Sequence, residues 1–286
     1  MPRLLAVGHV TFDRLAGGEA LGGSVSYAAL AARKLGWEVA VLTCAGSDFL
    51  PERDLPGVAA FVAPSAVTTR FVNVYGDDGE RQQSAPVRAG AIDLSALPDA
   101  WRDPDVLLLA PVAGELHGSL APSFQAGVVG AIAQGFVRGF EADGEVVPIA
   151  WRDPARALAG VHVLFLSEHD LPGGEVAARD LLAHVPMVAL TRGWRGLRLL
   201  SRSHAEEVPT LPRPEVDPTG AGDVFAAAFL VRYQETGDPG QAAAFAACAA
   251  SCVVEGVGAS TLGDRAQIEK RLLDRQRMID DGEWEE

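Results

Sequence analysis

Cysteine, long apolar runs and positive charge are all scarce in this chain, and each scarcity removes a class of protein. The 286 residues contain three cysteines, an odd number without the spacing of a metal site or a disulfide framework, which points to a reducing compartment. No apolar run approaches the roughly 20 residues that span a bilayer, and the N-terminal residues show no signal peptide. We therefore expect a cytoplasmic protein without a membrane partner.

Basic residues are outnumbered by acidic ones. Lysine and arginine total 24 against 38 aspartate and glutamate residues, which gives a formal net charge of −14. Because binding to a phosphate backbone depends on basic side chains, this balance argues against a nucleic-acid partner. The apolar fraction of 48% is sufficient for a substantial core. A small ligand held in one local pocket stays compatible with this composition.

Short apolar runs alternate along most of the chain with longer segments of helical character. Runs of four to eight apolar residues are typical of parallel strands buried on both faces. The alternation predicts an α/β fold, in which a doubly wound, mostly parallel sheet carries helices on both faces, and we treat residues 1–286 as a single domain. The predicted strands are 4–8, 38–43, 106–110, 128–133, 161–166, 188–191 and 197–200, and the predicted helices are 24–35, 174–184, 220–233, 239–254 and 265–280.

One segment departs from this alternation. Residues 68–83 alternate with a period of two, and Asp77-Asp78-Gly79 at their centre is typical of a hairpin turn. A lone hairpin can extend the edge of the sheet or cover the carboxyl ends of its strands. We expect a small lid formed mainly by residues 66–88.

The segment from Asp217 to Asp223, DPTGAGD, precedes an apolar helical run. The backbone N–H groups of Gly220, Ala221 and Gly222 are expected to lie without partners at the helix N-terminus, where the helix dipole favours negative charge. A carboxylate in the same first turn is out of place in a simple anion site. It fits a base that accepts the proton of a hydroxyl attacking phosphorus. The alternative is an aspartate that caps a buried helix.

This motif, together with further segments in order along nearly the whole chain, resembles the ribokinase-like (PfkB) carbohydrate kinase family. The resemblance implies ATP-dependent phosphorylation of an alcohol, with Asp223 as the base and residues 220–222 as the anion hole. It also implies Mg²⁺ as a cofactor.

On the acceptor side, Asp13 matches the family's acidic residue that binds substrate hydroxyls. Gly22-Gly23 is similar to the family's N-terminal Gly-Gly substrate signature. Tyr27 stands where ribokinase has a substrate-binding asparagine, which argues against ribose. Arg138 is similar in position to a family arginine that could reach phosphate.

On the donor side, residues 191–196, TRGWRG, resemble the family's T-x-G-x-x-G segment, and residues 246–259 resemble the helix and loop that enclose the adenine. From the residue pattern alone, Cys248 and Cys252 are small core residues four apart in a helix. Both interpretations of Cys248 stay open. The residues that the resemblance places beside the nucleotide are Thr191, Gly193, Gly196, Thr219, Cys248 and Gly258.

The family's magnesium motif, N-x-x-E, is altered here to Ser-Glu-His-Asp. Either Glu168 or Asp170 could organise Mg²⁺ through its waters. Asp217 matches a residue that helps to position a monovalent cation such as K⁺ in many members. Residues 14–21 are too few for the hairpin that many members insert there, so the lid is small. A small lid favours a monomer, with a dimer left open.

The acceptor is predicted to be a small neutral polyol. The stretch LGGSVSY looks most like the inositol-kinase branch of the family, so a cyclitol or simple sugar comes first and a nucleoside second. A homologue that binds sugar or nucleotide without turnover is a further alternative. His9 could line the substrate pocket, Glu115 could contact substrate or lie on the surface, and Trp37 and Trp194 are expected to pack.

Overall fold

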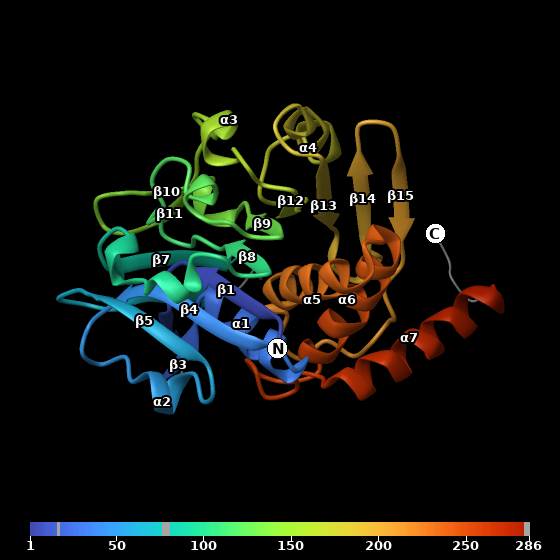
Figure 1. The fold of residues 1–286 in the computed structure, drawn as a ribbon, viewed down its shortest axis with the longest axis horizontal. Coiled ribbons are helices and arrows are strands. Elements are labelled where there is room, and N and C mark those ends of the chain that lie inside the picture. Colours follow the sequence, from blue (N-terminus) through green and yellow to red (C-terminus); the bar gives the residue numbers. More distant parts are fainter. Residues whose placement is uncertain (16–17, 76–80, 283–286) are drawn as a thin grey trace.

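The computed structural model describes residues 1–15, 18–75 and 81–282, which form a nine-stranded main sheet with helices around it and a smaller second sheet (Figure 1). The strand order of the main sheet is β15-β14-β13-β12-β9-β8-β1-β4-β5. All pairs from β13 to β5 are parallel, and β14 and β15 add an antiparallel edge. The doubly wound, mostly parallel sheet is thereby confirmed. Its strands are β1 (Arg3–Val7), β4 (Glu38–Ala45), β5 (Ala59–Pro64), β8 (Val106–Leu109), β9 (Val128–Ile132), β12 (Val163–Ser167), β13 (Met187–Thr191), β14 (Leu197–Ser201) and β15 (Ala205–Val208).

Helices cover the two faces of this sheet unequally. The larger core cluster lies under the long helices, whereas the opposite face is covered by α4 and by short 3₁₀ segments. No helix in the described ranges is long and apolar enough to cross a membrane. The helices are α1 (Ser24–Lys34), α2 (Pro51–Asp54), α3 (Pro154–Ala157), α4 (Glu175–Asp180), α5 (Ala221–Thr236), α6 (Pro239–Val253) and α7 (Arg265–Asp280).

Helix α5 is the central helix of the covered face. Every residue from Val224 to Val231 is buried, because α5 packs between α1, α6 and strands β8, β9 and β12. A helix that is apolar on all sides is stable only when it is surrounded in this way. The surroundings therefore fix the position of its first turn, which carries the DPTGAGD motif.

The second sheet has the order β3-β2-β6-β7, with β2 (Thr11–Leu15), β3 (Gly18–Gly22), β6 (Thr69–Tyr75) and β7 (Arg81–Val87). Strands β2 and β3 form an antiparallel hairpin, so the expectation that residues 14–21 are too few for one is wrong. The physical reason is that β2 also pairs in parallel with β6, which shares the cost of ordering such short strands. The predicted β6–β7 hairpin is present, and its expected turn at residues 77–79 lies outside the described residues. A separate two-stranded ribbon pairs β10 (Arg138–Phe140) with β11 (Val146–Pro148).

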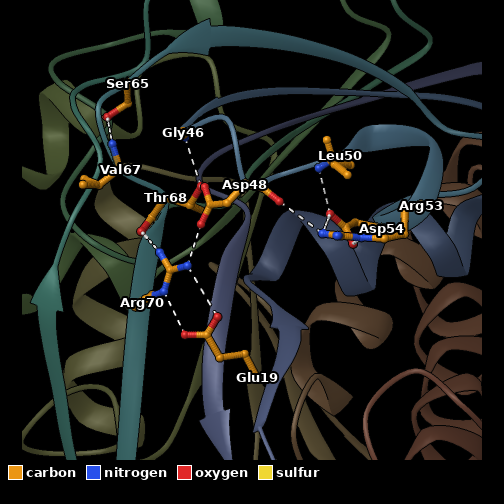
Figure 2. A network of polar contacts seen from close by, with 10 residues as sticks. All are labelled: Glu19, Gly46, Asp48, Leu50, Arg53, Asp54, Ser65, Val67, Thr68 and Arg70. Carbon is orange, nitrogen blue, oxygen red and sulfur yellow. Dashed lines mark hydrogen bonds and ion pairs between the residues drawn. The ribbon is translucent and has the colours of Figure 1, made fainter.

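Arg70 connects the second sheet to the main body (Figure 2). Its guanidinium pairs with Glu19 of β3 at 2.8 Å and with Asp48, in the loop after β4, at 2.5 Å. The Thr68 hydroxyl donates to the same Asp48 carboxylate and accepts the N–H of Gly46. These contacts hold the start of β6 against the loop after β4.

Candidate active site

A cleft of about 590 Å³ opens between the second sheet and the carboxyl ends of the main strands. Ligands in open α/β sheets bind at this edge, where loops from several strands converge. The lining comes from β2 and β6, from the loops after β12 and β13, and from the N-terminus of α5. Chain segments more than 200 residues apart in the sequence therefore share one cavity.

Asp223 lies in the first turn of α5 and lines the cleft. Burial raises its pKa from 3.8 to about 6, and the negative charges of Asp170 and Asp13 act in the same direction. A hydrogen bond from the Ser24 hydroxyl and the charge of Arg138 oppose this rise. The carboxyl is thus ionised at neutral pH and still basic enough to take a proton.

The glycines before Asp223 are required for different reasons. Gly220 has φ +82°, and a Cβ there would lie 2.2 Å from the ring of Tyr27. A Cβ on Gly222 would meet no atom within 4 Å, so it would project into open space. The Ala221 N–H donates to the Pro218 carbonyl at 3.2 Å, which corrects the prediction that all three N–H groups lack partners. Among the described residues, no backbone partner is recorded for the N–H groups of Gly220 and Gly222.

Asp13 of β2 reaches the same cleft from the second sheet. Its carboxylate occupies the space of a side chain at Gly22, where a Cβ would lie 2.6 Å from Oδ1. Thr11 donates to that oxygen at 3.0 Å. Gly23 has φ +88°, and a Cβ there would lie 2.4 Å from the His9 carbonyl oxygen. The Gly-Gly pair thus permits the close approach of β2 to the start of α1.

Tyr27 is buried in α1, and its ring lies beneath Gly220. Burial raises the pKa of its hydroxyl, as do the negative charges of Asp13, Asp217 and Asp223. The phenol therefore stays neutral among three carboxyl groups. Tyr27 thus lies close both to Asp13 of β2 and to the N-terminus of α5.

The two candidate magnesium acids have different surroundings. Glu168 accepts two hydrogen bonds from Arg195, at 2.6 and 2.7 Å. Asp170 accepts the Ser167 N–H at 2.6 Å, and burial raises its pKa while the charge of Arg138 lowers it. No group of three His, Cys, Asp or Glu side chains arranged as metal ligands occurs in residues 1–15, 18–75 and 81–282.

Four of the residues predicted to bind nucleotide, Thr191, Gly193, Gly196 and Thr219, line the cleft. Cys248 does not line the cleft and is fully buried within α6, so the core interpretation of this residue is the one that fits. Its small apolar side chain fills space between packed helices. Six further residues with apolar side chains line the cleft: Leu197, Leu211, Pro212, Ala247, Ala250 and Val254.

Asp217 and Gly258 do not line the cleft and lie next to residues that do. The Asp217 carboxylate accepts the N–H of Thr219 at 2.9 Å and the N–H of Gly258 at 3.1 Å. These bonds tie the DPTGAGD loop to the loop after α6.

Several cleft residues were missed or misjudged from the sequence. Phe71 and Gln83 line the cleft without any signal in the sequence, whereas Ser24, in the LGGSVSY stretch expected at the substrate, lines it as predicted. Trp194 was expected to pack, but its side chain is 76% exposed and lines the cleft, whereas Trp37 is buried as predicted.

His9 and Glu115 are both buried and line no part of the cleft. The prediction of a substrate contact for His9 is therefore wrong, and Glu115 contacts neither substrate space nor solvent.

Comparisons with known proteins agree with this geometry. The model of the "pfkB family carbohydrate kinase" matches residues 131–265. A cytidine kinase of Thermococcus kodakarensis is 30% identical in an alignment of 260 positions that covers 80% of this chain and 88% of that enzyme. An inositol 3-kinase of Zea mays is 37% identical over 101 residues, 34% of this chain and 25% of the relative. A solved pyrophosphate-dependent kinase of the ribokinase family superposes with a TM-score of 0.79 at 22% identity, covering 93% of this chain and 99% of that one.

The chain belongs to the pfkB family of carbohydrate kinases. The sequence-based expectations of this family, of its fold and of an ATP-dependent kinase are thereby confirmed.

Proposed function

We propose that the protein transfers the terminal phosphoryl group of ATP to a hydroxyl of a small neutral polyol, with Asp223 as the general base. The observation that carries this proposal is the position of Asp223: ionised at neutral pH, facing the cleft, at the N-terminus of a buried helix. Asp13 faces the same cleft from the second sheet, where its carboxylate can accept hydrogen bonds from substrate hydroxyls. We propose that the second sheet is the lid of a single-domain, monomeric enzyme.

The proposed phosphoryl transfer needs no reactant besides ATP and the acceptor alcohol. The acceptor oxygen forms a bond to the γ-phosphorus while the bond from that phosphorus to the bridging oxygen of ADP breaks, and Asp223 takes the hydroxyl proton. The N–H groups of Gly220 and Gly222 are available to hold the oxygens of the transferring group, where a Cβ on Gly222 would intrude. Arg138, whose charge acts on both Asp223 and Asp170, lies where it can neutralise phosphate.

The fit of Mg²⁺ rests on Asp170, a carboxylate that lines the cleft beside the arginine that would face phosphate. Glu168 is less suited because Arg195 already neutralises it. A bound Mg²⁺ would offset phosphate charge, and it keeps several waters in most sites, so one protein carboxylate is sufficient. A monovalent cation such as K⁺ near Asp217 belongs to the same proposal and is tested by replacing potassium with a bulky organic cation.

A nucleoside is the second candidate acceptor. The similarity to the cytidine kinase extends over 80% of the chain, further than that to the inositol 3-kinase. Phe71 in the cleft offers an aromatic surface for a base, while Asp13 suits a polyol or a ribose equally well.

The test is a panel of cyclitols, pentoses, hexoses and nucleosides incubated with ATP and Mg²⁺ and scored by ADP release. Release with a cyclitol or sugar supports the first candidate, and release with nucleosides alone supports the second. Thermal stabilisation by ligands without ADP release would instead identify a homologue that binds without turnover. The Asp223→Asn variant is the control, because it should bind the same ligands and release little ADP.

A further inference from the structure

Four passages of the chain connect the main sheet to the second sheet, and residues in or directly next to each of them lie against one buried histidine. The passages are residues 8–10 after β1, 22–24 before α1, 65–68 before β6 and 88–93 after β7. His9 belongs to the first passage, and its side chain is 1% exposed.

The imidazole of His9 joins the two passages at the base of the β6–β7 hairpin. Its Nε2 lies 2.7 Å from the Gly90 carbonyl oxygen, and its Nδ1 lies 2.9 Å from the Thr69 hydroxyl. Since a carbonyl oxygen only accepts, Nε2 donates to Gly90, and Nδ1 shares a hydrogen bond with the Thr69 hydroxyl. The Thr69 oxygen in turn accepts the Ala89 N–H at 3.0 Å. Both ring nitrogens of His9 and the hydroxyl of Thr69 therefore have hydrogen-bond partners in this buried network.

The backbone of His9 contacts the loop after β8 through Glu115 and the passage before α1 through Gly23. Its N–H donates to the Glu115 carboxylate at 2.7 Å, and its carbonyl oxygen lies so close to Gly23 that a Cβ there would be 2.4 Å away. Glu115 is also buried, and its carboxylate accepts the N–H groups of Val112 and Ala113 in the loop after β8. Its own carbonyl oxygen accepts the N–H of Ile92, in the passage that returns from the second sheet. Glu115 thus anchors the histidine to the main body.

We infer that His9, Thr69 and Glu115 form the pivot of the second sheet and act as positioning residues for phosphoryl transfer. Asp13 lies on the second sheet and Asp223 on the main body, so the distance between them depends on how the two parts meet. Acceptor alignment is sensitive to displacements of about 1 Å, which can cost on the order of a hundredfold in rate. The exposed ion pair of Arg70 with Asp48 in Figure 2 joins the same two parts from the solvent side. It is weaker, because exposed ion pairs are screened by water.

The test compares Thr69→Val, which keeps the shape of threonine and removes the hydroxyl, with Thr69→Ser, which keeps the hydroxyl and removes one methyl group. This inference rests on the proposed function for its kinetic readout. We expect Thr69→Val to lower kcat/KM for the acceptor at least tenfold while the KM for ATP changes less than twofold. Thr69→Ser should stay within threefold of the wild type. Should Thr69→Val not fold, His9→Gln replaces it, because glutamine keeps a donor near the Nε2 position and loses the ring nitrogen that bonds Thr69.

Two outcomes overturn the inference. One is a Thr69→Val enzyme whose acceptor kcat and KM both stay within twofold of the wild type. The other is a fall in kcat that is matched by an equal fall in the folded fraction, measured by circular dichroism and thermal unfolding on the same sample, since this shows only a structural role.

Amide hydrogen exchange gives a readout that needs no turnover. In Thr69→Val, strands β2, β6 and β7 should exchange faster, while β8 and β9 stay as protected as in the wild type. Equal acceleration in both sheets, or none, contradicts a pivot. If the wild type phosphorylates no acceptor, the proposed function fails, and hydrogen exchange decides on the pivot by itself.

Discussion

The Asp223→Asn substitution should stabilise the unliganded protein at alkaline pH while it suppresses turnover. Burial raises the pKa of Asp223 from 3.8 to about 6, so the folded protein binds this proton more tightly than the unfolded chain does. The stability that protonation provides is therefore complete below pH 3.8 and is lost as the pH rises through about 6. Asparagine carries no charge at any pH and avoids the loss.

The size of the effect follows from the shift. Each pKa unit corresponds to about 1.4 kcal/mol, so the ionised carboxylate costs the fold at most about 3 kcal/mol at pH 8. The side chain is partly open to the cleft, where water screens its charge, and we expect a gain of roughly 1 to 2 kcal/mol. This corresponds to about 2 to 8 °C in melting temperature for a protein of this size. Loss of the base lowers kcat by roughly 10² to 10⁴.

The assay is thermal or denaturant unfolding of both proteins at pH 4 and pH 8 without ligands. The stability gain of Asp223→Asn should be present at pH 8 and nearly absent at pH 4. Asp93→Asn is the control of opposite sign, because hydrogen bonds from Ser95 lower the pKa of Asp93 and its charge stabilises the fold. A gain of equal size at both pH values for Asp223→Asn, or no gain at pH 8, refutes the reasoning.

Three further outcomes test the site. Gly222→Ala should leave the melting temperature unchanged or higher, because the new Cβ meets no atom within 4 Å and alanine favours a helix. It should nevertheless lower kcat at least tenfold, and a wild-type rate contradicts the proposed anion cradle. Gly220→Ala should lower the melting temperature, since φ is +82° and the new Cβ collides with Tyr27, and a scan showing no loss would exclude that contact. Arg138→Gln should move the acidic limb of the kcat/KM profile to higher pH, because the charge of Arg138 lowers the pKa of Asp223; an unmoved limb means that the two groups do not interact.

Local patterns in the sequence were sufficient for seven of the nine strands of the main sheet and for the position of the DPTGAGD motif. Strands such as β1, β8 and β12 are buried on both faces, so each appears as an uninterrupted apolar run. Strands β5 and β15 were missed because they lie at the two edges of the sheet, where half-exposed positions break such a run. Residues 217–223 predicted the proposed base and the proposed glycine cradle, because the helix start, the glycines and the carboxylate are adjacent in the chain.

The remaining parts of the site depend on contacts between distant segments, for which a single sequence carries no local signal. Nothing near Ser24 indicates a hydrogen bond to Asp223, and nothing near Cys248 separates a core residue from a nucleotide contact. His9 and Glu115 are 106 residues apart, and the sequence left a ligand contact open for each. Folding buries the Glu115 carboxylate against backbone N–H groups, including that of His9, and buries the His9 ring between the Gly90 carbonyl and the Thr69 hydroxyl. A buried polar group must find a partner, and the fold alone determines which one lies within reach.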